Sequence, residues 1–167
     1  MAWEYLDKLD YRYKQASKFI TDEDFVVDVN SGNSRMRDYV KNYISNDLNY
    51  SEADYQMTDE QFREVIDACD VLCCFGVGGY EITKEELESK TVSDTLVYLT
   101  EKFKPRLLIL EAIEQFTPII KNILERVNYK IDKLIETEND KSVSHMEFVL
   151  KRKLYICKTQ YTNNTKI

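Results

Sequence analysis

Apolar residues recur at intervals of three and four along most of the chain, and this spacing places side chains on one face of an α-helix. The first such stripe runs from Trp3 to Ile20 and predicts an opening helix over about residues 2–20. Ser34, which suits an N-cap, precedes a second stripe that ends near Leu48. Residues 25–29 are instead a short run, Phe-Val-Val-Asp-Val, which is the best strand candidate although no partner strand is evident.

Three further helices are predicted from capping boxes, in which Ser or Thr precedes Glu or Gln by three residues. These boxes begin at Thr58, Thr83 and Ser144. The helix that starts after Thr58 is expected to end at the glycine cluster 76–79, because glycine readily adopts the left-handed conformation of a helix C-cap.

The apolar positions between residues 105 and 137 follow a seven-residue repeat, which predicts a long helical hairpin region. Pro118 either kinks this helix or ends it and starts another, with Thr117 as the cap and Pro118 in the first turn. The stripe is wider than a two-stranded seam, so packing within a bundle is favoured and self-association is the competing use. Its seam positions are Leu110, Ile113, Ile120, Leu124, Val127, Ile131 and Leu134.

The composition agrees with a helical chain. Only four glycines and two prolines occur among the 167 residues, too few turn-forming residues for an all-β sandwich or barrel. Hydrophobic residues make up 43% of the chain, which is enough to bury a core. We therefore predict an all-α fold: a single-domain helical bundle of about six or seven helices over residues 1–157, with a frayed polar tail over 158–167.

Targeting and membrane-spanning signals are not evident in the sequence. The first residues contain no apolar run after a basic patch, and no apolar stretch approaches the ~20 residues that cross a bilayer. The four cysteines are expected to be buried, reduced thiols. These observations predict a cytoplasmic protein that does not contact membranes.

Histidine-based catalysis and metal binding are limited to one candidate residue. His145 is the single histidine, and it lies among capping-box residues at a predicted helix start, where a catalytic role is rare. A zinc site would have to combine His145 with Cys69, Cys73 and Cys157, at spacings that structural zinc sites do not show. We therefore expect no catalytic residue, no cofactor and no metal.

Two loops match binding motifs only in part. The glycine cluster 76–79 follows a predicted helix instead of a strand and lacks the lysine of a phosphate-binding loop. Residues 28–32 have the polar character of a calcium loop, but Tyr39 occupies the position where the bidentate acid belongs. Both segments are predicted to be structural turns.

Acidic charge is concentrated in the first part of a chain whose net charge is −7. Residues 1–103 hold 22 of the 30 acidic side chains but only 11 of the 23 basic ones. Between Asp47 and Asp70, Arg63 is the only base among eight acids, and nearby tyrosines supply rigid contact area. The expected partner-binding residues are Asp47, Tyr50, Glu52, Asp54, Tyr55, Asp59, Glu60 and Glu64.

We hypothesise from this charge pattern a non-enzymatic, acidic helical interaction protein of the kind that phage and virus inhibitors represent. Its surface would mimic nucleic acid and occlude the basic surface of a host protein, such as a nucleic-acid-binding enzyme, without binding nucleic acid directly. The alternative is a self-associating structural or regulatory module, a homodimer through the apolar seam of residues 110–134.

Overall fold

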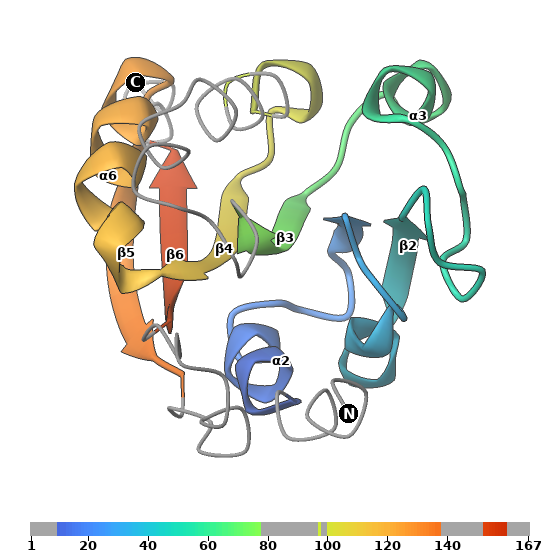
Figure 1. The fold of residues 1–167 in the computed structure, drawn as a ribbon, viewed down its shortest axis with the longest axis horizontal. Helices are drawn as coiled ribbons and strands as arrows, with labels where there is room; N and C mark the ends of the chain where they lie inside the picture. Colours follow the sequence, from blue (N-terminus) through green and yellow to red (C-terminus); the bar gives the residue numbers. More distant parts are fainter. Residues whose placement is uncertain (1–9, 78–96, 98–99, 138–151, 160–167) are drawn as a thin grey trace.

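A computed structural model describes residues 10–77, 97, 100–137 and 152–159, and its centre is a six-stranded sheet (Figure 1). The strand order is β2-β1-β3-β4-β6-β5. Neighbouring strands among β2, β1, β3 and β4 are parallel, whereas β6 is antiparallel to both β4 and β5. The strands are β1 (Phe25–Val29), β2 (Asn42–Asn46), β3 (Val71–Val77), β4 (Leu107–Ile113), β5 (Tyr129–Glu136) and β6 (Arg152–Thr159).

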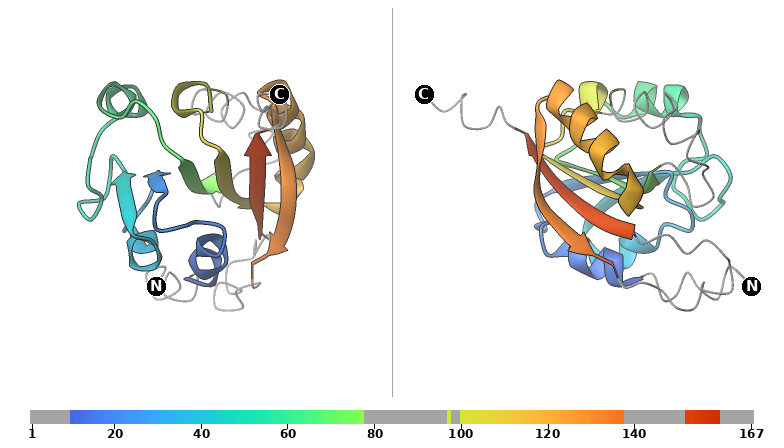
Figure 2. Two further views of the ribbon diagram at one scale, coloured as in Figure 1. Left: turned by 180° about the vertical axis from the view of Figure 1, so that it is seen from behind. Right: turned by 60° about the vertical axis from the view of Figure 1, so that its left-hand side comes forward.

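Helices cover both faces of this sheet (Figure 2). One face carries α2 (Asp10–Ser17) and the 3₁₀ helix η2 (Arg35–Tyr39). The other face carries α3 (Asp59–Val65) and α6 (Thr117–Arg126), and α6 follows the 3₁₀ turn η3 (Glu114–Phe116). The molecule is therefore a three-layer α/β structure.

Alternate residues of the central strands fill two separate cores. In β3, Val71 and Cys73 pack toward α2, while Leu72 and Cys74 pack toward α3 and α6. A strand that is buried on both faces reads as a continuous apolar run without a polar repeat, as is common in parallel sheets. Such a run has the same signature as a buried helix segment in the sequence.

The prediction of an all-α bundle is wrong for this reason. The predicted hairpin over 105–137 is divided among β4, α6 and β5, and its only α-helix is the ten-residue α6. Most seam residues are placed in different elements, with Leu110 in β4, Ile120 in α6 and Ile131 in β5. A continuous heptad helix for self-association is thus absent from these described residues.

Among the other predicted elements, some are confirmed and others are wrong. The capping box at Thr58 is present, with Gln61 as its partner, but α3 ends at Val65 and the residues expected to continue it form β3. The second predicted helix is a short 3₁₀ turn followed by β2. The strand predicted over 25–29 is β1, and its partners are β2 and β3.

Several predictions fall on residues outside the described ranges. These are most of the first half of the opening helix, the helices begun by Thr83 and Ser144, His145 and the tail beyond Thr159. Lys158 and Thr159, expected to lie in that tail, belong to β6. Among the described residues, no helix has the length and apolar character needed to span a bilayer.

Candidate functional site

The order of the strands creates a switch point between β1 and β3. After β1 the chain turns to one side to form β2, and it then returns past β1 to form β3 on the other side. The two connections leave β1 toward opposite sides of the sheet, which makes the carboxyl ends of β1 and β3 a topological switch point. Ligands of open α/β sheets bind at this position.

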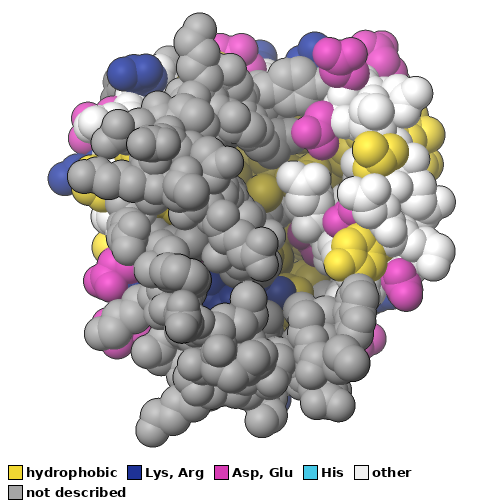
Figure 3. Space-filling model, in the orientation of Figure 1, with side chains coloured by type: hydrophobic (Ala, Val, Ile, Leu, Met, Phe, Trp, Pro, Cys, Tyr) yellow, Lys and Arg dark blue, Asp and Glu magenta, His cyan; other side chains and the backbone are white. Residues whose placement is uncertain are grey.

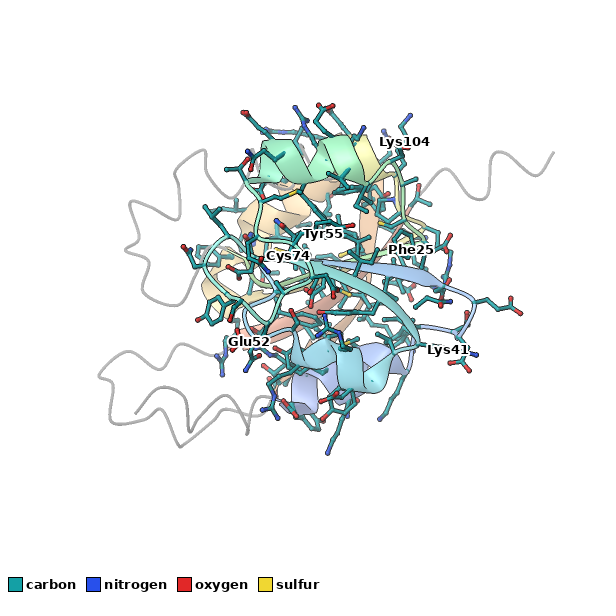
Figure 4. The ribbon with its side chains drawn as sticks, turned by 90° about the vertical axis from the view of Figure 1, so that its right-hand side faces the viewer. Phe25, Lys41, Glu52, Tyr55, Cys74 and Lys104 are labelled. Carbon is teal, nitrogen blue, oxygen red and sulfur yellow. The ribbon has the colours of Figure 1, made fainter. Side chains whose placement is uncertain are left out.

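The carboxyl ends of the strands can be located in Figure 4. Phe25, which begins β1, lies toward the same side as Lys41 and Lys104, which precede β2 and β4. Glu52, in the loop after β2, lies toward the opposite side, and Cys74 of β3 lies between them. The candidate site is therefore on the side of Glu52.

The loop after β1 adopts an unusual backbone conformation. Asn30, Gly32 and Ser34 all have positive φ angles, of 52°, 59° and 59°. A non-glycine residue in this region costs about 1–2 kcal/mol, and such residues gather at functional sites. A Cβ atom added to Gly32 would meet nothing within 4 Å, so the backbone here borders open space.

Asp47 connects this loop to the end of β2. One carboxylate oxygen accepts the Gly32 N–H at 2.8 Å, and the other accepts the Asn49 N–H at 3.0 Å. Only 9% of Asp47 is exposed. Each oxygen keeps a further lone pair, so the carboxylate can still accept hydrogen bonds from a ligand.

A hydroxyl network supports the strained loop from beneath. Ser34 donates a hydrogen bond to Ser45 of β2 at 2.8 Å, and its oxygen lies 2.9 Å from that of Ser31. Ser31 also donates its backbone N–H to the Asn46 carbonyl at 3.2 Å. Ser34 therefore holds its left-handed conformation with side-chain bonds that glycine could not make.

Asp28 is buried one residue before the end of β1, and only 1% of it is exposed. Burial raises the pKa of its carboxyl group to about 7, although the hydroxyl of Tyr43 donates a hydrogen bond to Oδ2. Its other oxygen, Oδ1, has no hydrogen-bond partner within the described ranges. Burial and the charge of Asp28 raise the pKa of Tyr43, which keeps the hydroxyl protonated as a donor.

A buried ion pair links α2 to the end of β4. The Arg12 Nη1 and Glu111 Oε1 atoms are 2.6 Å apart, and the two side chains are 6% and 0% exposed. The guanidinium also lies over the rings of Tyr13 and Phe75, at 4.6 and 5.5 Å from the centroids. Because Phe75 belongs to β3 and Glu111 to β4, Arg12 connects α2 with two neighbouring strands.

The eight residues predicted to bind a basic partner occupy different environments. Asp47 is buried at the site, and Asp54 forms an ion pair with Arg37 at 2.9 Å. The ring of Tyr55 packs near Phe62 of α3. The remaining five are half-buried, as Tyr50 and Asp59 are, or exposed, as Glu52, Glu60 and Glu64 are.

These acidic side chains do not form one continuous surface on the described part of the face in Figure 3. They lie at separate points over α3 and the loop after β2, with uncharged side chains and backbone between them. Among the predicted seam residues, Leu110, Ile120 and Leu124 lie in one buried core, and Val127 and Ile131 pack against it. Leu134 in β5 is 44% exposed, and Ile113 is the last residue of β4.

Sequence reasoning missed Arg12, Asp28, Gly32, Tyr43 and Glu111 at this site. A signal for part of the set was present, because Asp28 lies at the end of the one predicted strand, before a turn that contains Gly32, and Asp47 follows 19 residues later. An acidic residue about 20 residues after such a turn is typical of nucleotide-binding folds. Among the described residues, no group of three or more metal-binding side chains is found.

Solved structures with the same fold are named as methyltransferases. No family model matches the chain, and no curated protein matches it. The magnesium protoporphyrin IX methyltransferase of Synechocystis PCC 6803, solved with bound SAM, has a TM-score of 0.62 and 12% identity, over 93% of this chain and 79% of that one.

Two further structures are similar to the same degree. A putative RNA methyltransferase from Pyrococcus horikoshii has a TM-score of 0.61 and 9% identity, over 92% of this chain and 84% of that one. A TehB-like SAM-dependent methyltransferase from Corynebacterium glutamicum has a TM-score of 0.58 and 8% identity, over 89% and 87% of the two chains.

This likeness establishes the fold, and it corrects the functional prediction drawn from the sequence. The prediction of a non-enzymatic, helical, virus-type inhibitor that mimics nucleic acid was drawn from the charge pattern, and it is contradicted because the described residues form an α/β fold that solved proteins named as methyltransferases share. The alternative of a self-associating helical module fails with the predicted all-α bundle. The chain has the α/β fold of SAM-dependent methyltransferases.

Proposed function

We propose that the protein is a methyltransferase that uses S-adenosylmethionine (SAM). The observation that carries the proposal is the switch-point site, where the loop of Gly32 and the carboxylate of Asp47 meet outside the strand ends. The names of the structural neighbours, one of them solved with bound SAM, support the same ligand. The fold alone does not decide function, so the residues must fit the ligand.

The polar groups at the site suit an adenosine with a positively charged tail. Ribose hydroxyls are donors, and Asp47 retains lone pairs for them after accepting two backbone N–H groups. The open space beside Gly32 allows a ligand to approach the backbone. The buried Asp28 Oδ1 atom can accept a hydrogen bond from a ligand that reaches it.

The chemistry needs a site that binds and orients two molecules. When bound, SAM supplies a methyl group on a cationic sulfonium, which an acceptor's lone pair takes as the carbon–sulfur bond breaks and its electron pair remains on sulfur. Asp47 would hold the ribose, and the carboxylates near the strand ends would favour a cation over a neutral product. The Arg12–Glu111 pair keeps the ends of β3 and β4 in place beneath the site.

The proposal is tested by titrating the purified chain with SAM in a calorimeter. We expect saturable binding that Asp47→Asn weakens about 10-fold to 100-fold, because a hydrogen bond to a charged acceptor contributes about 1.5–3 kcal/mol. Asp67→Asn is the matched control, since Asp67 is exposed in the connection between α3 and β3. Circular dichroism verifies that both variants are folded.

Two results would overturn the proposal. The first is no binding of SAM by the wild type up to about 1 mM, a concentration that detects all but the weakest complexes. The second is equal affinity in the wild type and Asp47→Asn, which would place the ligand elsewhere.

A further inference from the structure

Four carboxyl groups act through their charges on one another or on Cys74 of β3. Burial, with smaller effects from the charges of Asp28, Asp59 and Glu111, raises the pKa of the Cys74 thiol to about 12. Asp47 in turn raises the pKa values of Asp28 and Asp59, after the larger effect of burial. Asp28, Asp59 and Glu111 therefore lie within electrostatic range of Cys74, and Asp47 lies within range of Asp28 and Asp59.

Several basic side chains of the described residues form ion pairs with carboxylates other than Asp28, Asp47 and Asp59. Arg12 pairs with Glu111 at 2.6 Å, and Arg37 pairs with Asp54 at 2.9 Å. Two further pairs are Arg35 with Asp10 at 2.6 Å and Lys153 with Glu114 at 3.2 Å. After this pairing, Asp47 and Asp59 have no ion-pair partner among the described residues and leave surplus negative charge at the site, whereas burial raises the pKa of Asp28 to about 7.

A second observation indicates that this charge is directed toward a ligand. Asp28 is 1% exposed, and its Oδ1 atom lacks a hydrogen-bond partner among the described residues. A buried acceptor of this kind costs about 1–3 kcal/mol unless a donor reaches it. No group of three or more metal-binding side chains is found in the described part of the chain. An N–H or O–H donor of an organic ligand would satisfy this acceptor.

Acidic groups also extend from this buried centre to the surface. Asp47 and Asp59 are buried and half-buried, and Glu52 and Glu60 beyond them are exposed. A site lined by one sign of charge attracts molecules of the opposite sign and repels those of its own. One positive charge on SAM does not balance this surplus.

We infer that the methyl acceptor of this site is an amine carried on a flexible stem, and that polyanions such as RNA are rejected. The amine binds as its ammonium cation and then loses a proton to solvent, so that the nitrogen lone pair can take the methyl group while the carbon–sulfur bond of SAM breaks and its electron pair stays on sulfur. This inference rests on the proposed function and names its substrate class. The amine can belong to a lysine side chain of a protein or to a free polyamine, since both present a cation at the end of an aliphatic chain. The acidic residues of the site and its surroundings, Asp47, Glu52, Asp59 and Glu60, thus attract basic molecules as substrates.

Equilibrium binding of two labelled probes tests the inference. The first probe is a fluorescein-labelled lysine-rich peptide, and the second is a labelled single-stranded RNA of similar length. We expect the peptide to bind and the RNA not to bind. Peptide affinity should fall about tenfold between about 50 and 300 mM salt, because exposed charges are screened within ~10 Å.

Charge reversal locates the peptide on the protein. Glu52→Lys combined with Glu60→Lys should weaken peptide binding about tenfold and permit measurable RNA binding. Glu23→Lys combined with Glu101→Lys is the control, because these exposed residues precede β1 and β4 at the opposite edge and give the same net charge. The control should leave the affinity for the peptide within about twofold of the wild type.

Competition with spermidine identifies the source of the amine. Displacement of the peptide by spermidine supports a free polyamine, and retention of the peptide supports a protein lysine. Tighter binding of RNA than of peptide would overturn the inference, as would equal effects of the two double variants. Calorimetry with SAM is run on the same samples, so that SAM binding without peptide binding refutes the inference alone and leaves the proposed function standing.

Discussion

Replacement of Arg12 should reveal how strongly the site depends on one buried charge. Arg12→Met removes the guanidinium and leaves Glu111, whose side chain is 0% exposed, without its ion-pair partner. Breaking a buried pair from one side costs about 3–5 kcal/mol, because the remaining charge stays in a poorly solvating environment. That cost is a large share of the ~5–15 kcal/mol that stabilises a typical domain.

The double variant Arg12→Met with Glu111→Leu should recover most of this loss. Both charges are then replaced by apolar side chains of similar size, and such replacements are often neutral or stabilising. We expect the free energy of unfolding of the double variant to lie within about 1 kcal/mol of the wild-type value, so the effects of the two changes are strongly non-additive. The free energies come from urea unfolding monitored by circular dichroism.

An exposed ion pair serves as the control. Lys158 and Asp132 are 3.3 Å apart, with side chains 52% and 32% exposed. Lys158→Met should cost less than about 1 kcal/mol, because solvent screens exposed pairs. If the double variant at 12 and 111 loses as much stability as the sum of its two single changes, the pair is not acting through buried charge and this reasoning fails.

Two further predictions concern the loop and the carboxyl group beneath it. Ser34→Ala should lower the free energy of unfolding, measured with urea, by about 1–3 kcal/mol because the hydrogen bond to Ser45 is lost. Ser34→Gly should be about 1 kcal/mol more stable than Ser34→Ala, because glycine adopts the positive φ of 59° without strain. Equal stabilities of the two variants would contradict the strain argument. The pKa of Asp28, raised to about 7, means that the folded state holds this proton longer than the unfolded state, so stability should fall as pH rises from about 4 to about 7. Asp28→Asn should lack this fall in thermal unfolding followed across pH 4–8, and parallel profiles for wild type and variant would exclude the assignment.

Local features of the fold could be predicted from the sequence, because they depend on residues that are neighbours along the chain. The capping box of Thr58 and Gln61 forms within one helical turn, and it is present as predicted. Pro118 was expected either to kink a helix or to begin one, and it lies in the first turn of α6. The run 25–29 was identified as a strand from its β-branched content and its flanking turn.

Strand partners could not be read in the same way. The partners of Val27 are Ile44 and Leu72, far along the chain, and nothing in a local window links these residues. Leu107, Leu110 and Ile113 are spaced like one helix face, but they belong to β4, where the apolar run Leu107–Leu110 is buried on both faces of the sheet. Periodicity cannot separate these two cases, so the wrong element was chosen.

The sequence by itself determined where helices could begin, which segments were apolar and that acidic residues dominate the first part of the chain. Only the tertiary structure decided that the apolar segments pair as a sheet and that the candidate site exists. Arg12 and Glu111 are 99 positions apart, and Asp28 lies between them in the sequence. Arg12 and Glu111 meet because α2 packs on the sheet beside β4, and Asp28 lies near the same edge because parallel strands bring their carboxyl ends together. Both arrangements arise from long-range pairing and burial, which no local pattern of residues encodes.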